Sequence, residues 1–335
     1  MNLVTGATGL LGSHIVEKLA AAGQPVCALV RANSNTDFLD RLPVEKRIAN
    51  LAEMNSLQSI CRDVEAVYHC AAQVGDYGRW HEFQANTVQA AIHIATAALG
   101  AGVRRFVHIS SVSVYGQSDR PSLILTEEQP LAQRVPRWFY YTRAKVAAEE
   151  HLWRMYNQQG LPLTVIRPAW IYGPRDRHRL PRLYDALKSS RYRIIGAGQN
   201  SLNAVYSGNV ADACLLAAGN PAAIGQAYNI SRDGCIRQMD FFAKLARELH
   251  CPVPDAHIPY RLAQSVGLGC EAISHLVRST RPPLISRYAV WWLGQEVSFP
   301  TDKAHEQLGW SPAVTYDEGI RRTAEWYLSF QNKGI

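Results

Sequence analysis

The sequence predicts an α/β protein in which a doubly wound parallel sheet carries a smaller C-terminal substrate lobe. Strand-like and helix-like segments alternate over the first half of the chain, and a glycine-rich loop joins the first strand to the first helix. A length of 335 residues with 47% hydrophobic and 19% charged side chains is an ordinary globular balance. We expect residues 1–173 and 204–230 to form the sheet domain, and residues 174–203 and 231–335 to form the lobe.

The glycine-rich loop is the first candidate binding element. An apolar run at residues 1–4 is typical of a strand, and apolar residues at helical spacing follow the loop. In this context Gly6 allows a tight turn, Gly9 lets backbone N–H groups approach a pyrophosphate, and Gly12 lets the helix pack closely on the sheet. The loop therefore predicts a Rossmann dinucleotide site, whose expected contacts are Gly6, Thr8, Gly9, Leu10, Leu11 and Gly12.

The end of the second predicted strand, residues 25–31, bears on which dinucleotide is bound. About twenty residues beyond such a loop, NAD sites place an acidic side chain on the ribose diol. Arg31 occupies that place here, and it is followed by Asn33, Ser34 and Asn35. An arginine suits the 2′-phosphate of NADP, so we expect NADP(H). NAD(H) is the alternative if Arg31 is only a solvated residue at a strand end.

Tyr141 and Lys145 form the candidate catalytic pair. Residues four apart on a helix project from the same face, so the ammonium of Lys145 is expected beside the phenol of Tyr141. A positive charge within about 4–6 Å lowers the pKa of a phenol from its reference value of roughly 10. Tyr141 is therefore a candidate general acid and base for a carbonyl or an alcohol.

Together these motifs give the chain a family resemblance. It resembles the extended short-chain dehydrogenase/reductase superfamily nearly end to end, on the residues Gly6, Gly9, Gly12, Ser111, Tyr141 and Lys145. The resemblance implies that Lys145 holds the nicotinamide ribose. It also implies that Asn86, which is expected to open a helix after Gln84-Ala85, is the active-site asparagine and would support a proton relay. It also implies that Ala71 and Ala72 lie beside the cofactor at the end of the fourth strand, and that Pro168 borders the nicotinamide.

One position departs from the family pattern. Members usually have Gly-Asp-Leu after the third strand, where this chain has Ala49-Asn50-Leu51. Asn50 keeps a hydrogen-bond acceptor but not the negative charge. Asn50 and Leu51 are the expected contacts of the adenine end of the cofactor.

The active-site serine has to be chosen among Ser110, Ser111 and Ser113. Counting back from Gly116 in the family pattern favours Ser111. Its hydroxyl would donate to the substrate oxygen while Tyr141 exchanges the proton. Ser110 or Ser113 would then only cap the strand end.

The branch of the superfamily is indicated by two segments. Sugar dehydratases carry a Thr-Asp-Glu run where this chain has residues 111–113, Ser-Val-Ser, so the acid needed to protonate a leaving hydroxyl is missing. Residues 203–212 instead resemble the branch that contains 3β-hydroxysteroid dehydrogenases, decarboxylating sterol-carboxylate dehydrogenases and β-keto acid reductases. Nucleotide-sugar epimerases remain an alternative, because they need only the serine, tyrosine, lysine and a retained cofactor.

Two residue clusters in the predicted lobe bear on the substrate. One is aromatic and apolar and the other is basic, and they comprise Tyr288, Trp291, Trp292 and Leu293, and Arg175, Arg177, Arg179 and Arg182. A hydrophobic slot beside arginines would suit an apolar molecule that bears a carbonyl and a carboxylate. Core packing or a solvated helix face would explain either cluster equally well.

We therefore expect an NADP(H)-preferring oxidoreductase that interconverts a ketone and a secondary alcohol on a mainly apolar substrate of steroid, flavonoid or keto-acid type. The alternative is a nucleotide-sugar epimerase with tightly bound NAD. A third hypothesis, a regulatory dinucleotide-binding protein without turnover, is disfavoured because every catalytic residue type is present.

Composition limits the other function classes. The formal net charge of +7 comes from scattered residues, so we expect no nucleic-acid partner. Seven cysteines without a Cys-x-x-Cys pair suit reduced thiols and give no metal-binding spacing. Because the first strand starts at residue 1 and no apolar run reaches about 20 residues, we expect a cytoplasmic protein without a signal peptide or membrane span.

A homodimer is the expected assembly. The segment 87–102 is apolar around more of its circumference than one core-facing stripe requires. The sheet can cover only one side of it. A second copy could cover the other side together with the helix that carries Tyr141 and Lys145, as the family resemblance also implies.

Overall fold

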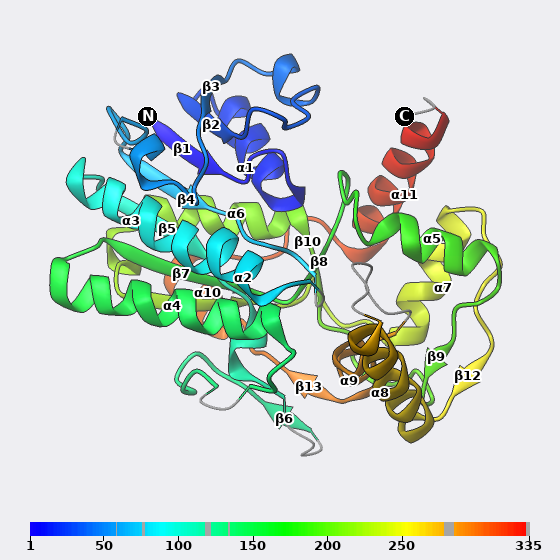
Figure 1. Ribbon diagram of the computed structural model, residues 1–335. Helices are drawn as coiled ribbons and strands as arrows, with labels where there is room; N and C mark the ends of the chain where they lie inside the picture. The colour runs from blue at the N-terminus through cyan, green and yellow to red at the C-terminus, as the bar shows by residue number, and fades with distance from the viewer. Residues whose placement is uncertain (58, 76–77, 118–121, 133–134, 278–284, 333–335) are drawn as a thin grey trace.

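Seven strands form one parallel sheet in the computed structural model, which describes residues 1–57, 59–75, 78–117, 122–132, 135–277 and 285–332 (Figure 1). The strand order is β11-β7-β5-β4-β1-β2-β3, so the chain starts inside the sheet and reverses direction beside β1. Open α/β sheets bind ligands at the carboxyl ends of the strands at such a reversal. The strands are β1 (Asn2–Thr5), β2 (Val26–Val30), β3 (Glu45–Ile48), β4 (Ala66–His69), β5 (Arg105–Ile109), β7 (Leu163–Pro168) and β11 (Gln226–Ile230).

Helices cover both faces of this sheet. On one face the apolar core includes side chains of α1 (Leu10–Ala21), α6 (Ser207–Gly219) and α10 (Asp302–Leu308). On the other face it includes side chains of α3 (Ala90–Gly100) and α4 (Tyr140–Gln159). This arrangement confirms the predicted doubly wound α/β class.

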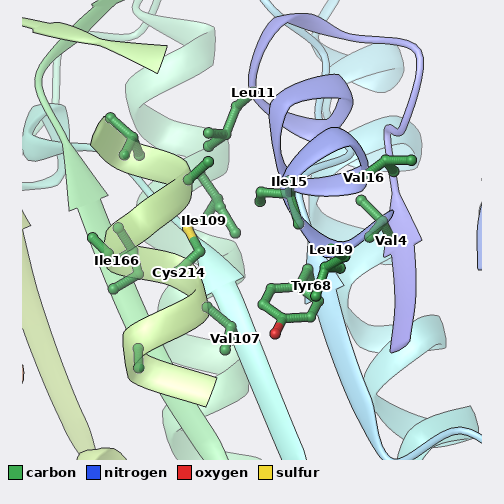
Figure 2. Close-up of a cluster of buried hydrophobic side chains, with 14 of the residues drawn as sticks. Val4, Leu11, Ile15, Val16, Leu19, Tyr68, Val107, Ile109, Ile166 and Cys214 are labelled. Atoms are coloured by element: carbon green, nitrogen blue, oxygen red, sulfur yellow. The ribbon is translucent and has the colours of Figure 1, made fainter. Parts of the chain in front are cut away.

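The first of these cores follows directly from the helical spacing in the sequence. Leu11, Ile15 and Leu19 lie one turn apart on α1 and are all buried. Figure 2 shows them on the side of α1 that turns toward α6 and the strands, near Cys214 and Tyr68. This packing fixes the height of α1 above the sheet and so positions the glycine loop at its N-terminal end.

The remaining elements lie mainly in the second half of the chain. Three parallel pairs join β8 (Trp170–Tyr172) to β10 (Ala204–Tyr206), β6 (Leu123–Ile124) to β13 (Val297–Ser298), and β9 (Ile194–Ile195) to β12 (His257–Ile258). The other helices are α2 (Trp80–Phe83), α5 (Leu180–Lys188), α7 (Gln238–Glu248), α8 (Tyr260–Leu276), α9 (Arg287–Gly294) and α11 (Tyr316–Asn332). Shorter helical turns are η1 (Leu39–Arg41), η2 (Met54–Leu57), the π-helical η3 (Gln84–Gln89), η4 (Val112–Tyr115) and η5 (Pro221–Ala223).

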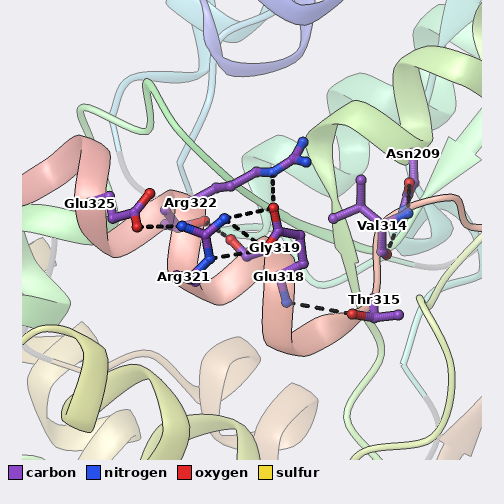
Figure 3. Close-up of polar contacts among 9 residues, drawn as sticks. Asn209, Val314, Thr315, Glu318, Gly319, Arg321, Arg322 and Glu325 are labelled. Atoms are coloured by element: carbon purple, nitrogen blue, oxygen red, sulfur yellow. Dashed lines mark hydrogen bonds and ion pairs between the residues drawn. The ribbon is translucent and has the colours of Figure 1, made fainter.

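The C-terminal segment is anchored on α6 by one side-chain amide. Asn209 donates from Nδ2 to the carbonyl oxygen of Val314 at 2.8 Å and accepts from the N–H of Val314 through Oδ1 at 3.0 Å (Figure 3). Beyond this anchor, Glu318 binds both Arg321 and Arg322 on the exposed start of α11. Asn209 therefore fixes where α11 begins.

Residues from the predicted lobe segment also contribute to the core of the sheet. Ala304, Leu308 and Trp310 pack in the same apolar cluster as α1 and α6. The boundaries of the two units stay a prediction. In the described part of the chain, no helix combines the length and the apolar composition needed to cross a bilayer.

Candidate active site

The glycine loop turns tightly at the end of β1. Gly6 has a φ of +65°, and its carbonyl oxygen accepts a 2.9 Å hydrogen bond from the N–H of Gly9. Gly9 is the N-cap of α1, and no side chain caps this helix end. Backbone N–H groups of the first turn are therefore presented as a pyrophosphate site requires.

Two further contacts explain why this loop needs glycine. A Cβ built on Gly12 would lie 2.2 Å from the carbonyl oxygen of Gly6, and one built on Gly6 would lie 2.9 Å from the N of Ala71. Backbone atoms, which cannot move aside cheaply, form both contacts. Gly6 and Gly12 thus allow α1, β1 and the end of β4 to approach one another.

The end of β4 is tied to the end of β1. Thr5 Oγ1 lies 2.8 Å from Nδ1 of His69 and accepts a 3.2 Å hydrogen bond from the N–H of Ala71. Burial lowers the pKa of His69 to about 3, so its imidazole is neutral at physiological pH. Ala71 and its neighbour Ala72 are half-buried. Their place beside the glycine loop is compatible with the predicted contact with the cofactor.

The two residues expected at the adenosine end lie at the carboxyl ends of β2 and β3. Arg31 is exposed, and its backbone N–H donates to Ser34 Oγ at 3.1 Å. Asn50 is exposed too, but its side chain is engaged locally, with Nδ2 donating to Glu53 at 2.6 Å and Oδ1 accepting from the N–H of Ala52. Leu51 follows it and is half-buried. An adenine contact by Asn50 would require exchange of these local bonds.

Tyr141 and Lys145 lie on the same face of α4, one turn apart. Nζ of Lys145 is 6.0 Å from the centre of the Tyr141 ring and donates a 2.7 Å hydrogen bond to the carbonyl oxygen of Ile109. Burial lowers the pKa of Lys145 to about 8, while Cys70 and Glu149 act against this shift. The ammonium is therefore held at the end of β5.

Ser111 follows β5 directly and begins the turn η4. Its Oγ accepts a 3.1 Å hydrogen bond from the N–H of Ser113, and the residue is 9% exposed. The two neighbouring serines are buried more deeply. Ser110 donates to Glu149, and the hydroxyl of Ser113 is buried. Among the three, Ser111 is the least buried.

Asn86 lies in a different local structure from the one expected. The sequence suggested that it opens a helix, but it lies inside the π-helical turn η3, between α2 and α3. π-Helical turns are rare and frequently occur at functional sites. Phe83 and Val88, which flank it, pack in one cluster with Tyr141, so η3 and the catalytic helix are in contact. Pro168, the last residue of β7, is buried.

The sequence analysis missed a buried polar group behind these residues. Glu149 and Arg167 form an ion pair at 2.5 Å with 0% and 4% exposed side chains. Arg167 Nη1 also donates to the hydroxyl of Tyr115 at 2.8 Å. A glutamate one turn after Lys145, on the helix stripe that faces the sheet, was the signal that could have revealed this group.

One residue of each cluster expected around the substrate has a structural contact. Arg175 binds α1, donating to Ser13 Oγ at 2.8 Å and to Glu17 at 2.6 Å. Arg177, Arg179 and Arg182 are exposed, and the guanidinium of Arg177 lies 5.9 Å from the centre of the Phe330 ring. Trp291 is 3% exposed and packs in a core cluster with Val112, so core packing explains that residue. A slot of aromatic side chains beside these arginines stays a prediction.

The described residues contain no candidate metal site. No three side chains among their histidines, cysteines, aspartates and glutamates come together in a way that could hold an ion.

Comparison with curated proteins gives relatives along nearly the whole chain. A 4-hydroxy-2-methyl-3-oxo-4-farnesyl-3,4-dihydroquinoline-1-oxide ketoreductase of Stigmatella aurantiaca is 29% identical, over 95% of this chain and 93% of its own length. A 2-alkyl-3-oxoalkanoate reductase of Stenotrophomonas maltophilia (strain K279a) is 28% identical, over 96% of this chain and 97% of its own.

Solved structures agree on the fold. A UDP-glucuronic acid 4-epimerase from Bacillus cereus, in complex with NAD, superposes with a TM-score of 0.76 at 19% identity and covers 98% of this chain and 99% of that one. The family model of the NAD dependent epimerase/dehydratase family matches residues 2–231. The chain therefore belongs to this family of extended short-chain dehydrogenases/reductases, enzymes that act on hydroxyl and keto groups.

Proposed function

We propose that this protein is an NADP(H)-preferring oxidoreductase that interconverts a ketone and a secondary alcohol on a mainly apolar substrate. The observation that carries the proposal is the 2.7 Å bond from Lys145 to Ile109, because it holds the helix of Tyr141 against the strand end of Ser111. The reductase names of two relatives, each matched over at least 95% of this chain, support keto reduction over epimerisation.

Each site residue has a role in this reaction. A bound nicotinamide would supply or accept the hydride at the substrate carbon. Ser111 would donate a hydrogen bond to the substrate oxygen, and Tyr141 would give that oxygen a proton in reduction and take it back in oxidation. Lys145 would bind the ribose and stabilise the ionised phenol, and Asn86 would support the proton relay. The glycine loop, with Pro168, Ala71 and Ala72, would hold the rest of the cofactor.

The preference for NADP(H) rests on Arg31. Its exposed guanidinium follows β2, where a 2′-phosphate would be recognised by charge-assisted hydrogen bonds. Two nearby acids, Asp37 and Asp40, already bind Asn35 and Lys46. Because these acids are engaged, Arg31 would be the charged side chain that contacts the ribose phosphate.

The apolar character of the substrate rests on what surrounds Ser111. Val112, its neighbour, is 2% exposed and packs with Leu125, Trp291 and Phe299 in one apolar cluster. Tyr115, Ala169 and Trp292 pack against this cluster and are only partly buried. A hydrocarbon skeleton or acyl chain would bury apolar area on these side chains, from which a polar sugar would gain little.

The test is turnover with exchangeable cofactor. Purified protein is mixed with NADPH and, separately, a 2-alkyl-3-oxo acid, a 3-keto steroid and a flavanone, and loss of NADPH absorbance is followed. We expect reduction of one class by the parent and none by Tyr141→Phe. Retained NAD together with interconversion of UDP-hexoses, without net use of NADPH, would establish the epimerase instead.

A further inference from the structure

A single buried carboxylate joins three elements of the site. Glu149 on α4 has no exposed side-chain surface. Its Oε2 accepts from Ser110 Oγ at 2.5 Å, and its Oε1 accepts from Trp153 Nε1 at 3.0 Å and from Arg167 Nη2 at 2.5 Å. Ser110 follows β5 and Arg167 lies in β7, so three separate segments converge on one side chain.

Two of these donors, Ser110 and Arg167, are direct sequence neighbours of residues in the proposed site. Ser110 precedes Ser111, and Arg167 precedes Pro168. Arg167 also donates to the hydroxyl of Tyr115, which in turn donates to Asn229 at 2.7 Å. The turn that starts at Ser111 is thus held at both ends, through Ser110 and through Tyr115.

Glu149 also acts on the proposed catalytic lysine by its charge. It lies one helical turn after Lys145, and its carboxylate favours the charged ammonium. The other titratable groups that face Lys145 are His69 and Cys70 at the end of β4, His108 on β5 and Tyr141 on α4. Burial keeps the two histidines neutral and lowers their pKa values, and it raises the pKa of Cys70 to about 12. Glu149 is therefore the buried anion beside the ammonium.

A gain in folding stability alone does not explain why Glu149 and Arg167 form a buried ion pair. A buried ion pair loses hydration on both partners, and replacement by neutral groups of similar volume is often neutral or stabilising. The geometry points to a second role. We propose that Glu149, paired with Arg167, is a positioning residue that holds Ser111 and the Lys145 ammonium in place. This inference rests on the proposed function of the site.

The test uses two single variants with opposite charge effects. Glu149→Gln removes the negative charge that favours the Lys145 ammonium, and Arg167→Met leaves that charge without its partner cation. NADPH affinity and urea unfolding of the apoprotein are each measured between pH 6 and pH 11. We expect the pH at which Lys145 loses its proton to fall by about one unit in Glu149→Gln and to rise in Arg167→Met.

The double variant Glu149→Gln/Arg167→Met covers the case in which a single variant does not fold. It restores charge balance, so its midpoint should lie between those of the two single variants. Its kcat should still be about tenfold to a hundredfold below the parent, with the KM for the keto substrate within about threefold, because the ends of β5 and β7 are no longer joined through α4. Parental kcat in the folded double variant would overturn the positioning role.

Asp233→Asn is the matched control. Asp233 is buried and accepts hydrogen bonds from Tyr172, from the N–H of Tyr206 and from Asn209, away from Lys145. This variant should lose stability without moving the midpoint. Shifts in the same direction for both single variants, or no shift in folded protein, would refute the inference. Apoprotein unfolding needs neither substrate nor cofactor, so a missing reductase activity would be recognised separately.

Discussion

Lys145 donates to the carbonyl oxygen of Ile109, the last residue of β5, and so ties the helix of Tyr141 to the strand that leads into Ser111. The tie brings a candidate proton donor and a candidate oxygen-orienting hydroxyl to one strand end. Substitutions of Tyr141 and Lys145 test this arrangement.

Tyr141→Phe should abolish turnover and leave the affinity for the dinucleotide nearly unchanged. The substitution removes only the hydroxyl that exchanges the proton, while the glycine loop and Lys145 remain. Steady-state rates and a cofactor titration on the same preparation measure both effects. Residual activity within tenfold of the parent would assign the proton transfer to another group.

Lys145→Met should remove one component of the pH dependence of stability. Burial places the pKa of Lys145 at about 8 in the folded protein, against 10.5 for an ordinary lysine. Between these values the unfolded chain holds a proton that the folded chain has released, so the unfolding free energy rises with pH and falls again as pH drops through 8. The rise attributable to Lys145 is on the order of 3 kcal/mol.

Because tyrosines and cysteines titrate in the same range, the quantity to measure is the difference between the parent and Lys145→Met in urea unfolding of the apoprotein. That difference should be constant below pH 7, should change between pH 8 and 10.5, and should favour the variant at pH 7. A flat difference over the whole range would show that the Lys145 amine is not desolvated.

Arg31→Asp should shift the preference from NADP toward NAD. The change removes a partner of the 2′-phosphate and supplies an acceptor for a ribose diol. A hydrogen bond to a charged group contributes roughly 1.5–3 kcal/mol, or about tenfold to a hundredfold in affinity. Titration of both proteins with both cofactors gives the ratio, and an unchanged ratio would leave Arg31 as a solvated residue.

Gly12→Ala should weaken both the fold and cofactor binding. Its Cβ would lie 2.2 Å from the Gly6 carbonyl oxygen, so α1 would have to move away from β1 at a cost of about 1–3 kcal/mol. Gly269→Ala is the matched control, because that helical glycine has no heavy atom within 4 Å of the added Cβ. It should gain about 0.5–1 kcal/mol from helix propensity and bind cofactor as the parent does. Equal effects of the two substitutions on binding would contradict the loop geometry.

The predicted homodimer should give about twice the 37.3 kDa chain mass in light scattering at micromolar concentration. The single chain already covers much of α3, since Ala91, Ile94, Ala95 and Ala98 are buried in the sheet core. Ile92 packs with the cluster that contains Phe83. The interface must therefore use the remaining outward surface of α3 and α4, and a monomer at that concentration would disprove it.

Sequence reasoning reached the parts of the molecule that are encoded locally. The glycine loop, the strand ends at Arg31 and Ser111, and the pairing of Tyr141 with Lys145 depend on short-range spacing and on the order of strands and helices. Each of these features can be recognised from a short stretch of sequence. The fold class follows from the same alternation of elements.

Contacts between segments that are distant in the sequence could not be predicted from it. Arg175 looks like a substrate-binding arginine in the sequence, yet it pairs with Glu17, 158 residues away. Glu149 and Arg167 look like an ordinary helix acid and strand-end base until the fold buries both. The π-helical turn at Asn86 depends on how η3 packs against α4, which no local pattern specifies.

The anchor formed by Asn209 also concerns how the chain is made. Asn209 holds Val314, 105 residues later, and its carbonyl oxygen accepts from the indole of Trp310 at 2.9 Å. One face of the sheet therefore lacks part of its cover until residues 304–314 have left the ribosome. Contacts of such long sequence separation form late and slow the folding of a domain. A nascent chain released before residue 304 would expose an apolar face, and that product should depend on chaperones although all of the proposed catalytic residues are present.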